Sequence, residues 1–323
     1  MNSNIHTQAE LIYNPNSGQM VLRRELNEVV LFLSRHGWHV TYRETQEAGQ
    51  ATQLTRQAVL NGAQVVIAAG GDGTINEVVN GLVNTNVSLG VLPVGTTNVW
   101  ALQMGIPALN PVHPETPVIK LIAYRKLLLD AARVLVEGRT VAVDVGYISG
   151  RYFLMWAGIG LDAKILESVS PQEKKTLGSW AYMFNAIGLT SRATGSDISL
   201  EMDGEKVNTK SPLVIVSNIQ LYGGIMAIGA KALLNDGKLD VCIFKGNGFF
   251  TFVQHAINVL SHRHLNDPKV EYYQCSKITL ESSLPLPVHT DAERFTETPV
   301  TIQTLPSSLK VIASWNIPGT LFL

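Results

Sequence analysis

Short apolar runs alternate with amphipathic segments through the first third of the chain. Val65–Ala69 is continuous in small and β-branched residues, which is typical of a parallel strand buried on both faces. Other segments place apolar residues at helical spacing and end at a glycine. This pattern predicts strands at Leu11–Tyr13, Trp38–Tyr42, Val65–Ala69 and Leu89–Leu92, and helices at Val21–His36, Gln50–Asn61 and Ile75–Val83. Such an order predicts an α/β fold, a parallel sheet with helices on both faces.

The pattern changes after Met104. Four prolines mark a loop, and Val118–Leu129 has the spacing of a last helix. Short strands bounded by Gly or Asp then follow at Arg139–Ile148, Tyr152–Ala157, Asp197–Met202, Leu213–Ser217, Leu239–Phe244 and Ser276–Glu281. This is the pattern of an antiparallel β-sandwich, interrupted by apolar helical segments at Lys174–Thr190 and Phe249–His262.

Composition and charge exclude several classes of protein. Hydrophobic residues make up 46% of the 323 positions, which is ample material for two buried cores. The net charge of −1 argues against a partner nucleic acid, because proteins that bind one carry a basic excess. The first residues lack the apolar core of a signal peptide, and no run approaches the ~20 apolar residues of a membrane span. We therefore expect a cytoplasmic protein whose two cysteines, Cys242 and Cys275, are free thiols.

The segment Gly70–Thr74 reads Gly-Gly-Asp-Gly-Thr, follows a buried strand and opens a helix. Glycines let a backbone approach a phosphate closely, and the N–H groups at a helix start point toward it. A Walker loop would need a lysine that is not in place, and the dinucleotide fingerprint would need glycine where Asn76 stands. The segment therefore predicts a phosphate site; the alternative is a tight turn that needs glycine for its geometry alone.

Asp72 lies within this segment. A carboxylate beside a phosphate would repel it unless a cation separates them, and Mg²⁺ binds carboxylate and phosphate oxygens together. Asp72 is therefore a candidate magnesium ligand. The alternative is a turn aspartate that bonds its own backbone.

The residues Gly70–Gly81 resemble a loop of the diacylglycerol kinase catalytic-domain family, which includes bacterial lipid kinases and sphingosine and ceramide kinases. NAD kinases and phosphofructokinases share Gly-Gly-Asp-Gly-Thr, but the extension through Asn80-Gly81 is similar to the lipid branch. Asn14–Gly18 and Leu92–Asn98 resemble two further nucleotide-contacting turns of the family. The resemblance implies an ATP site formed by Asn14, Asn16, Thr45, Gly70, Gly71, Asp72, Gly73, Thr74, Ile75, Asn76, Glu77, Gly95, Thr96 and Asn98.

Two motifs of the second half also resemble the family. Leu233–Asp240 is similar to a stretch that in bacterial members holds a structural Mg²⁺, which implies ligands at Leu233, Asp236 and Lys238. Its alternative interpretation is a plain Asp-Gly hairpin turn. Asp291-Ala292-Glu293 stands where the family has Asp-Gly-Glu, and the resemblance implies that this pair supplies the general base. Two carboxylates at i and i+2 on an extended segment should face the same side. We assign the base to Glu293 and a role in the metal network to Asp291, although the sequence alone does not separate these two roles. Without the resemblance, the pair would be interpreted as an exposed strand end.

Two residues depart from the family pattern. Val99 follows Asn98 where bacterial members usually have aspartate, so one carboxylate of the magnesium network is missing. Sphingosine and ceramide kinases also lack it, which leaves a different acceptor open. Ala292 replaces a glycine, and it should cost backbone freedom only if its φ is positive.

The sequence as a whole predicts an ATP- and Mg²⁺-dependent lipid kinase with Glu293, Asp291 and Asp72 as catalytic residues. The resemblance implies an NAD-kinase-like α/β domain over residues 1–132, to which 300–316 return, and a β-sandwich lipid-substrate domain over 133–299, with catalysis in the cleft between them. The alternatives are a soluble-substrate kinase related to NAD kinase and a non-catalytic nucleotide- or lipid-binding regulator. We also consider a homodimer, and peripheral contact with the inner face of a membrane through the apolar segment Lys174–Thr190, for which packing against the sandwich is the alternative.

Overall fold

The computed structural model describes residues 6–18, 22–108, 117–161, 195–224 and 226–323. The chain divides into two compact units. Unit 1 comprises Met1–Val143 and Ser307–Gly319, and unit 2 comprises Asp144–Pro306 and Thr320–Leu323. Two strands, β5 (Arg139–Ile148) and β16 (Val300–Ala313), carry the chain from one unit into the other. The units are therefore described one at a time.

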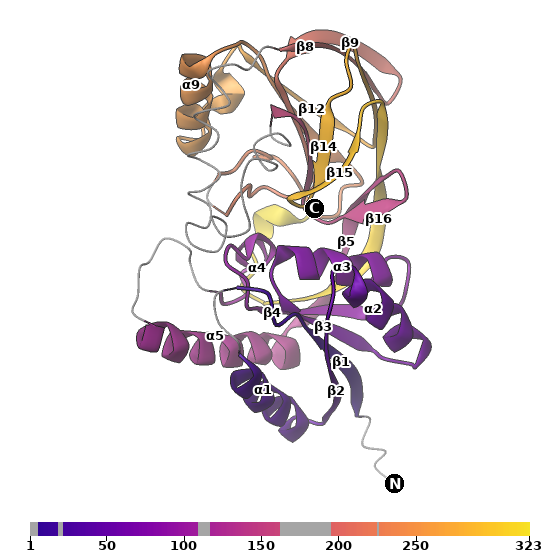
Figure 1. Ribbon diagram of the computed structural model, residues 1–323, viewed down its shortest axis with the longest axis vertical. Helices are drawn as coiled ribbons and strands as arrows, with labels where there is room; N and C mark the ends of the chain where they lie inside the picture. The colour runs from indigo at the N-terminus through magenta and orange to yellow at the C-terminus, as the bar shows by residue number, and fades with distance from the viewer. Residues whose placement is uncertain (1–5, 19–21, 109–116, 162–194, 225) are drawn as a thin grey trace. The chain divides into compact units, whose positions relative to one another are not determined.

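Unit 1 is built on a parallel sheet in the order β2-β1-β3-β4, as Figure 1 shows. Its strands are β1 (Thr7–Tyr13), β2 (Trp38–Glu44), β3 (Val65–Gly70) and β4 (Ser88–Pro93). Every residue of β3 and β4 is buried, as a continuous apolar run requires. The last part of β16 extends the sheet in parallel beside β4, with Lys310 opposite Ser88.

The described residues of unit 1 form five helices: α1 (Arg23–Arg35), α2 (Gln50–Leu60), α3 (Asp72–Leu82), α4 (Val99–Gln103) and α5 (Pro117–Glu137). Helix α1 packs against α5, and α2 packs against α3. Figure 1 shows these two pairs on opposite sides of the sheet. The predicted α/β fold, with helices on both faces of a parallel sheet, is confirmed.

Unit 2 is a sandwich of two mainly antiparallel sheets. One contains the first part of β16, β13 (Lys277–Ser282), β8 (Ser196–Met202) and β9 (Glu205–Ser211). The other runs in the order β12 (Val270–Cys275), β11 (Leu239–Phe244), β10 (Leu213–Ser217), β7 (Trp156–Gly160), β14 (Pro287–Thr290) and β15 (Glu293–Glu297). Alternate residues of facing strands, such as Ile198 and Leu200 from β8 and Val214 and Val216 from β10, form the core. The predicted sandwich is confirmed.

Smaller elements complete unit 2. Strand β6 (Arg151–Phe153) forms a hairpin with β5, and helix α9 (Phe249–Leu260) follows β11. A short 3₁₀ turn, η1 (His264–Asn266), follows α9, and a second one, η2 (Gly319–Leu321), lies near the end of the chain. Cys242 and Cys275 are buried free thiols, as expected. Among the described helices, none has the length and apolar character needed to cross a bilayer.

Several predicted boundaries were wrong. The predicted strand Tyr152–Ala157 is two strands, β6 and β7, separated by Leu154 and Met155. Helix α3 begins at Asp72 instead of Ile75, and the last helix of unit 1 ends at Glu137 instead of Leu129. Helix α4 and strands β9, β12, β14 and β15 were not predicted. The predicted helix Lys174–Thr190 lies outside the described residues.

Candidate active site

Three turns of unit 1 meet at the carboxyl ends of β1, β3 and β4. The Asn14 side-chain amide donates to the Thr74 hydroxyl at 3.2 Å, and the Ser17 hydroxyl lies 3.2 Å from the same oxygen. The Gly71 N–H donates to the Ser17 hydroxyl at 3.3 Å. These hydrogen bonds join the first turn to the Gly70–Thr74 segment. Residues of both segments belong to the ATP site that the resemblance implies. Ser17 itself was missed, although a hydroxyl residue beside Gly18 in that turn was a usable signal.

Backbone packs directly on backbone between these turns. A Cβ atom on Gly95 would lie 2.4 Å from the Gly71 Cα, and one on Gly18 would lie 2.2 Å from the Val94 carbonyl oxygen. Both distances are too short for any side chain, so these glycines permit the close approach of three loops. Gly18 also has a φ of 74°, which only glycine adopts readily.

The amino end of α3 lies at this meeting point. Its N-cap residue is Gly71, and no side chain caps the helix. The first N–H groups of a helix have no partner within the helix and carry the positive end of its dipole. A phosphate is a group that such an end binds well.

Asp72, the first residue of α3, contacts the third turn. Its carboxylate accepts the N–H of Val99 at 3.0 Å and the N–H of Trp100 at 3.1 Å, at the start of α4. A carboxylate offers about four lone-pair positions, so these two N–H groups do not by themselves exclude a cation or its water ligands. The oxygen chemistry of Asp72 fits Mg²⁺. Asp72 thus bonds the backbone of a distant turn, a contact for which the alternative of a plain turn aspartate does not account.

Asn98 fixes the shape of the third turn. It is fully buried with a φ of 50°, and its side-chain amide donates to the Gly95 carbonyl at 2.9 Å. Its Oδ1 atom is buried and has no hydrogen-bond partner among the described residues. Because a buried oxygen without a donor is costly, this atom is a candidate acceptor for a hydrogen-bond donor of a ligand.

The other predicted nucleotide residues differ in their surroundings. Gly73 lies in the first turn of α3, while Asn16 is exposed and Thr96 half-buried in their turns. Thr45 follows β2 and its N–H donates to the Tyr13 carbonyl at 2.9 Å. Ile75 and Asn76 are buried, and the Asn76 oxygens accept from the Asn80 amide. The Glu77 carboxylate accepts the Ala51 N–H at 3.0 Å, in the first turn of α2. Thr45 and Glu77 thus contact neighbouring elements and Asn76 bonds within its own helix, and the contact of these residues and of Ile75 with a nucleotide stays a prediction.

In unit 2, Asp291 and Ala292 form the two-residue loop of the β14–β15 hairpin, where Thr290 pairs with Glu293. Their φ angles are 47° and 64°. Asp291 is buried, and its carboxylate accepts the N–H groups of Leu154 at 2.7 Å, Met155 at 2.9 Å and Trp156 at 3.1 Å. These bonds explain why the predicted strand Tyr152–Ala157 breaks at Leu154 and Met155.

Glu293 has different neighbours from Asp291. Its side chain is about half exposed and forms an ion pair with Arg151, whose guanidinium lies 5.3 Å from the centre of the Phe295 ring. The expectation that both carboxylates face the same side of an extended segment was therefore wrong, because the loop turns the chain between them. The interpretation of the pair as an exposed strand end is also wrong for Asp291. Of the two carboxylates, Glu293 is the one exposed to solvent.

Comparison with known proteins assigns the chain to a family. Residues 8–148 match the diacylglycerol kinase catalytic domain, and residues 156–313 match the YegS C-terminal NAD kinase beta sandwich-like domain. A diacylglycerol kinase of Bacillus subtilis (strain 168) is 31% identical over 288 residues, which cover 88% of this chain and 89% of that protein. The chain belongs to the diacylglycerol kinase family.

Other family members cover the chain almost completely. A diacylglycerol kinase of Staphylococcus carnosus (strain TM300) is 28% identical over 317 residues, or 97% of each chain. The crystal structure of a diacylglycerol kinase from Bacillus anthracis str. Sterne superposes with a TM-score of 0.78 at 25% identity, covering 97% of this chain and 99% of that one. The resemblance found in the sequence is confirmed, and so is the two-part fold of the family.

The segment Leu233–Asp240, which resembles the family's Mg²⁺-binding stretch, contains a turn at Asp236-Gly237. The Lys238 N–H donates to Asp236 Oδ1 at 3.0 Å, and the Gly237 N–H donates to Asp144 Oδ2 at 2.6 Å. Among the described residues, no cluster of three or more His, Cys, Asp or Glu side chains could hold a metal. A site at Leu233, Asp236 and Lys238 would therefore combine one carboxylate with main-chain oxygens, a hard donor set that suits Mg²⁺. Metal binding there stays a prediction.

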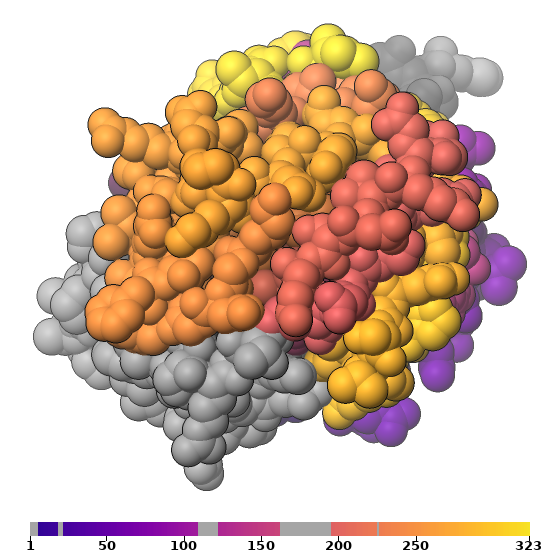
Figure 2. Space-filling view, turned by 90° about the horizontal axis from the view of Figure 1, so that it is seen from above, coloured from indigo at the N-terminus to yellow at the C-terminus, as the bar shows by residue number. Residues whose placement is uncertain are grey.

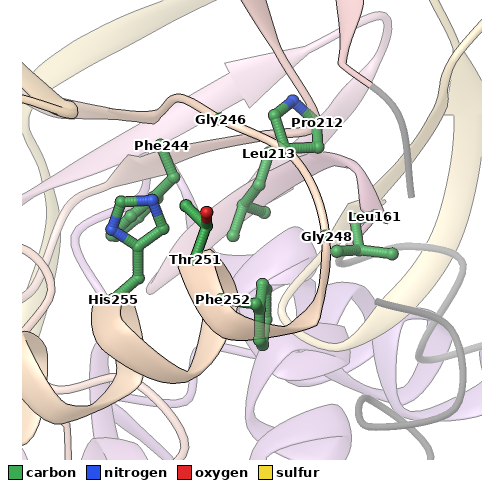
Figure 3. A pocket seen from close by; sticks show the side chains of 9 residues that line it. All are labelled: Leu161, Pro212, Leu213, Phe244, Gly246, Gly248, Thr251, Phe252 and His255. Atoms are coloured by element: carbon green, nitrogen blue, oxygen red, sulfur yellow. The ribbon is translucent and has the colours of Figure 1, made fainter. Parts of the chain in front are cut away.

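A shallow pocket lies elsewhere in unit 2, beside the start of α9 (Figure 3). Apolar side chains of Leu161, Leu213, Phe244 and Phe252 line most of it, and Thr251 and His255 add the polar atoms. None of the predicted catalytic, nucleotide or metal residues lines this pocket. We therefore assign it no part in the chemistry.

Proposed function

We propose that this member of the diacylglycerol kinase family transfers the γ-phosphoryl group of ATP to a lipid hydroxyl, in a direct reaction that requires Mg²⁺. The meeting of the three turns at Gly18, Gly71 and Gly95 is the observation that carries the proposal. Loops that allow no side chain at their contacts, placed at an uncapped helix start, suit a polyphosphate. The names of the relatives point to a lipid acceptor.

The proposed roles follow from where each group lies. The amino end of α3 binds phosphate, and Asn98 Oδ1 accepts a donor of the nucleotide or its metal-bound water. Asp72 is the residue of this turn cluster that would hold Mg²⁺, which supplies charge neutralisation to the phosphates when bound. Phosphoryl transfer also needs one group that accepts the proton of the attacking hydroxyl. Glu293 takes this role, because its carboxylate is solvent-accessible whereas that of Asp291 is buried under three N–H donors.

Asp291 takes a different role from the one the sequence suggested. Its carboxylate holds the backbone at Leu154–Trp156, and it thereby anchors the loop that leads into Glu293. We assign it the positioning of Glu293 within unit 2. Arg151 forms an ion pair with Glu293 and so helps to hold that carboxylate in position.

The test is transfer of labelled phosphate from ATP in the presence of Mg²⁺ to a panel of micellar diacylglycerol, monoacylglycerol, phosphatidylglycerol, sphingosine and ceramide, with NAD as the soluble acceptor. Glu293→Gln should lower the rate by at least 100-fold. The matched control is Glu297→Gln on the same strand, which should retain the wild-type rate because Glu297 is exposed and pairs only with Arg294 among the described residues.

The result also decides between the alternatives. Labelled lipid that is lost in Glu293→Gln and Asp72→Ala supports the proposal and names the acceptor. Labelled NAD in place of lipid would establish the soluble-substrate kinase instead. ATP binding with no labelled acceptor at all would favour the non-catalytic regulator.

A further inference from the structure

Helix α9 exposes an apolar face to solvent. Its twelve residues, Phe-Phe-Thr-Phe-Val-Gln-His-Ala-Ile-Asn-Val-Leu, carry no Asp, Glu, Lys or Arg. Phe250 is 85% exposed, Ile257 59% and Leu260 53%. Together with half-buried Val253 they recur at three- and four-residue spacing, so all four lie on one side of the helix. We call these four residues the α9 stripe. Figure 1 shows α9 on the outer side of the sandwich, and the orange residues that include it lie at the surface in Figure 2.

Two polar residues of α9, His255 and Asn258, bond to the rest of unit 2. His255 is buried, and its Nε2 lies 2.9 Å from the Lys245 carbonyl oxygen. The Asn258 amide donates to Asp267 Oδ2 at 2.7 Å. A surface helix of a water-soluble domain normally turns its apolar side inward and its polar side outward. Helix α9 instead has apolar residues on both sides, because Val259 is buried while Phe250, Ile257 and Leu260 are exposed, so water is a poor environment for the stripe.

Basic residues lie beside the carboxyl end of the stripe. His262 and Arg263 directly follow α9, and Lys269 precedes β12; all three are exposed. Two carboxylates lie nearby: Glu271 is balanced by its ion pair with Lys245, and the single charge of Asp267 is outnumbered by Arg263 and Lys269. The patch is therefore locally positive, although the whole chain has a net charge of −1.

We propose that the α9 stripe docks on an anionic lipid bilayer, with Phe250, Ile257 and Leu260 entering the boundary between headgroups and acyl chains. An uncharged apolar helix face with cationic residues at its edge is the combination that binds such a surface. A second copy of the chain would need negative charge to match Arg263 and Lys269, and no acidic group in α9 offers it. The choice of a lipid surface rests on the proposed function, since a lipid kinase meets its acceptor there.

The test is co-sedimentation of the full chain, without ATP, with vesicles of phosphatidylcholine that contain or lack phosphatidylglycerol. The wild-type protein should bind the anionic vesicles and be released as the salt concentration rises. The double variant Phe250→Gln/Ile257→Gln should lower the partition coefficient by about tenfold or more, because the apolar contact is lost. Arg263→Gln should lower it by about fivefold at low salt, and by little at high salt.

Leu60→Gln is the matched control. Leu60 ends α2 in unit 1 and is as exposed as Phe250, at 85%, so the variant removes an equally exposed apolar side chain outside the stripe. It should bind vesicles like the wild type. Unchanged binding of the double variant, or no binding by the wild type at low salt, would overturn the proposal. A wild-type dimer that the double variant converts to a monomer, without vesicle binding, would overturn it in favour of a second copy. Because no turnover is measured, failure of the docking leaves the kinase proposal standing, and the reverse is equally true.

Discussion

The Asp72 carboxylate accepts the backbone N–H of Val99 at 3.0 Å, across 27 residues of sequence. This bond joins the Gly70–Thr74 segment to α4, and the N–H of Trp100 adds a second one. The resemblance to bacterial family members drew attention to Val99 because a carboxylate is missing there. In the structure the contribution of this position is its backbone N–H, while its side chain is buried.

Val99→Asp, which restores the family residue, should therefore harm this chain. The new carboxylate would enter a buried position next to Asp72, so burial and like-charge repulsion should together lower the free energy of unfolding by about 3 kcal/mol. Urea unfolding of the purified variant measures the loss. Val99→Asn is the control of equal shape without the charge, and it should cost less. A Val99→Asp variant as stable as the wild type, with a higher kinase rate, would show that a carboxylate is accommodated at this position.

Changing Asp291 and Glu293 to their amides should have different effects on the free energy of unfolding. Asp291→Asn replaces one acceptor oxygen by an NH₂ group that faces N–H donors, so we expect a loss of about 3 kcal/mol of unfolding free energy. Glu293→Gln should leave that free energy within about 0.5 kcal/mol of the wild type, because the carboxylate is half exposed and surface ion pairs contribute little. Thermal and urea unfolding decide the point. Equal stability of both variants would return Asp291 to a purely chemical role.

The backbone strain of Ala292 can be measured by comparing two hairpin loops of unit 2. Asp291-Ala292 and Asp203-Gly204 each span two residues with positive φ, and in both the aspartate binds the backbone of a distant segment. Ala292→Gly should raise the free energy of unfolding by about 0.5–1 kcal/mol, because a φ of 64° strains alanine more than glycine.

Gly204→Ala is the reverse experiment. A Cβ at Gly204 would meet no atom within 4 Å, so only its φ of 93° opposes the change. The variant should lose about 1 kcal/mol. Opposite signs at the two loops would confirm that backbone conformation sets both effects; the same sign at both would contradict it.

The buried strands of unit 1 could be predicted because each carries its own signal. β3 and β4 are continuous apolar runs. Such a run alone is enough to identify a parallel strand that is covered on both faces. Strand β9, Glu205–Ser211, was missed because it lies at a sheet edge and is mostly polar and exposed. A period-2 pattern is weak when only one or two of its residues reach the core.

The arrangement around Asp291 could not be predicted for a different reason. Its partners Leu154, Met155 and Trp156 are more than 130 residues away in the chain, and nothing local marks their N–H groups as free to bond a side chain. The bond between Asp72 and Val99 is long-range in the same sense. Motifs located the candidate site residues, but only the folded chain shows that the Asp72 and Asp291 carboxylates accept backbone N–H groups and that Glu293 is exposed to solvent.

Asp240 should make the stability of the protein depend on pH. It lies on β11 almost without exposure, where burial raises the pKa of its carboxyl to about 6, against the opposing hydrogen bonds from Tyr272 and Gln274. The folded protein thus keeps a proton that the unfolded chain releases near its ordinary pKa of 3.8. Wherever the folded state binds more protons, the free energy of unfolding falls as pH rises. The fall should therefore occur between about pH 4 and about pH 6 and be complete above that range.

Asp240→Asn isolates this contribution. The amide stays neutral and its oxygen can still accept from Tyr272, so the variant should lack the fall and be more stable than the wild type near neutral pH by about 2 kcal/mol. Against the opposing effect of burial, hydrogen bonds lower the pKa values of Asp203 and Asp267, so the stability that these two carboxylates contribute is lost as pH falls. This loss occurs at more acidic pH and is equal in both proteins. The measurement is urea unfolding of the two proteins at about pH 4 and about pH 7. Parallel pH profiles would mean that the Asp240 carboxylate is stabilised in its charged form, and its partners in the fold would then need to be sought beyond Tyr272 and Gln274.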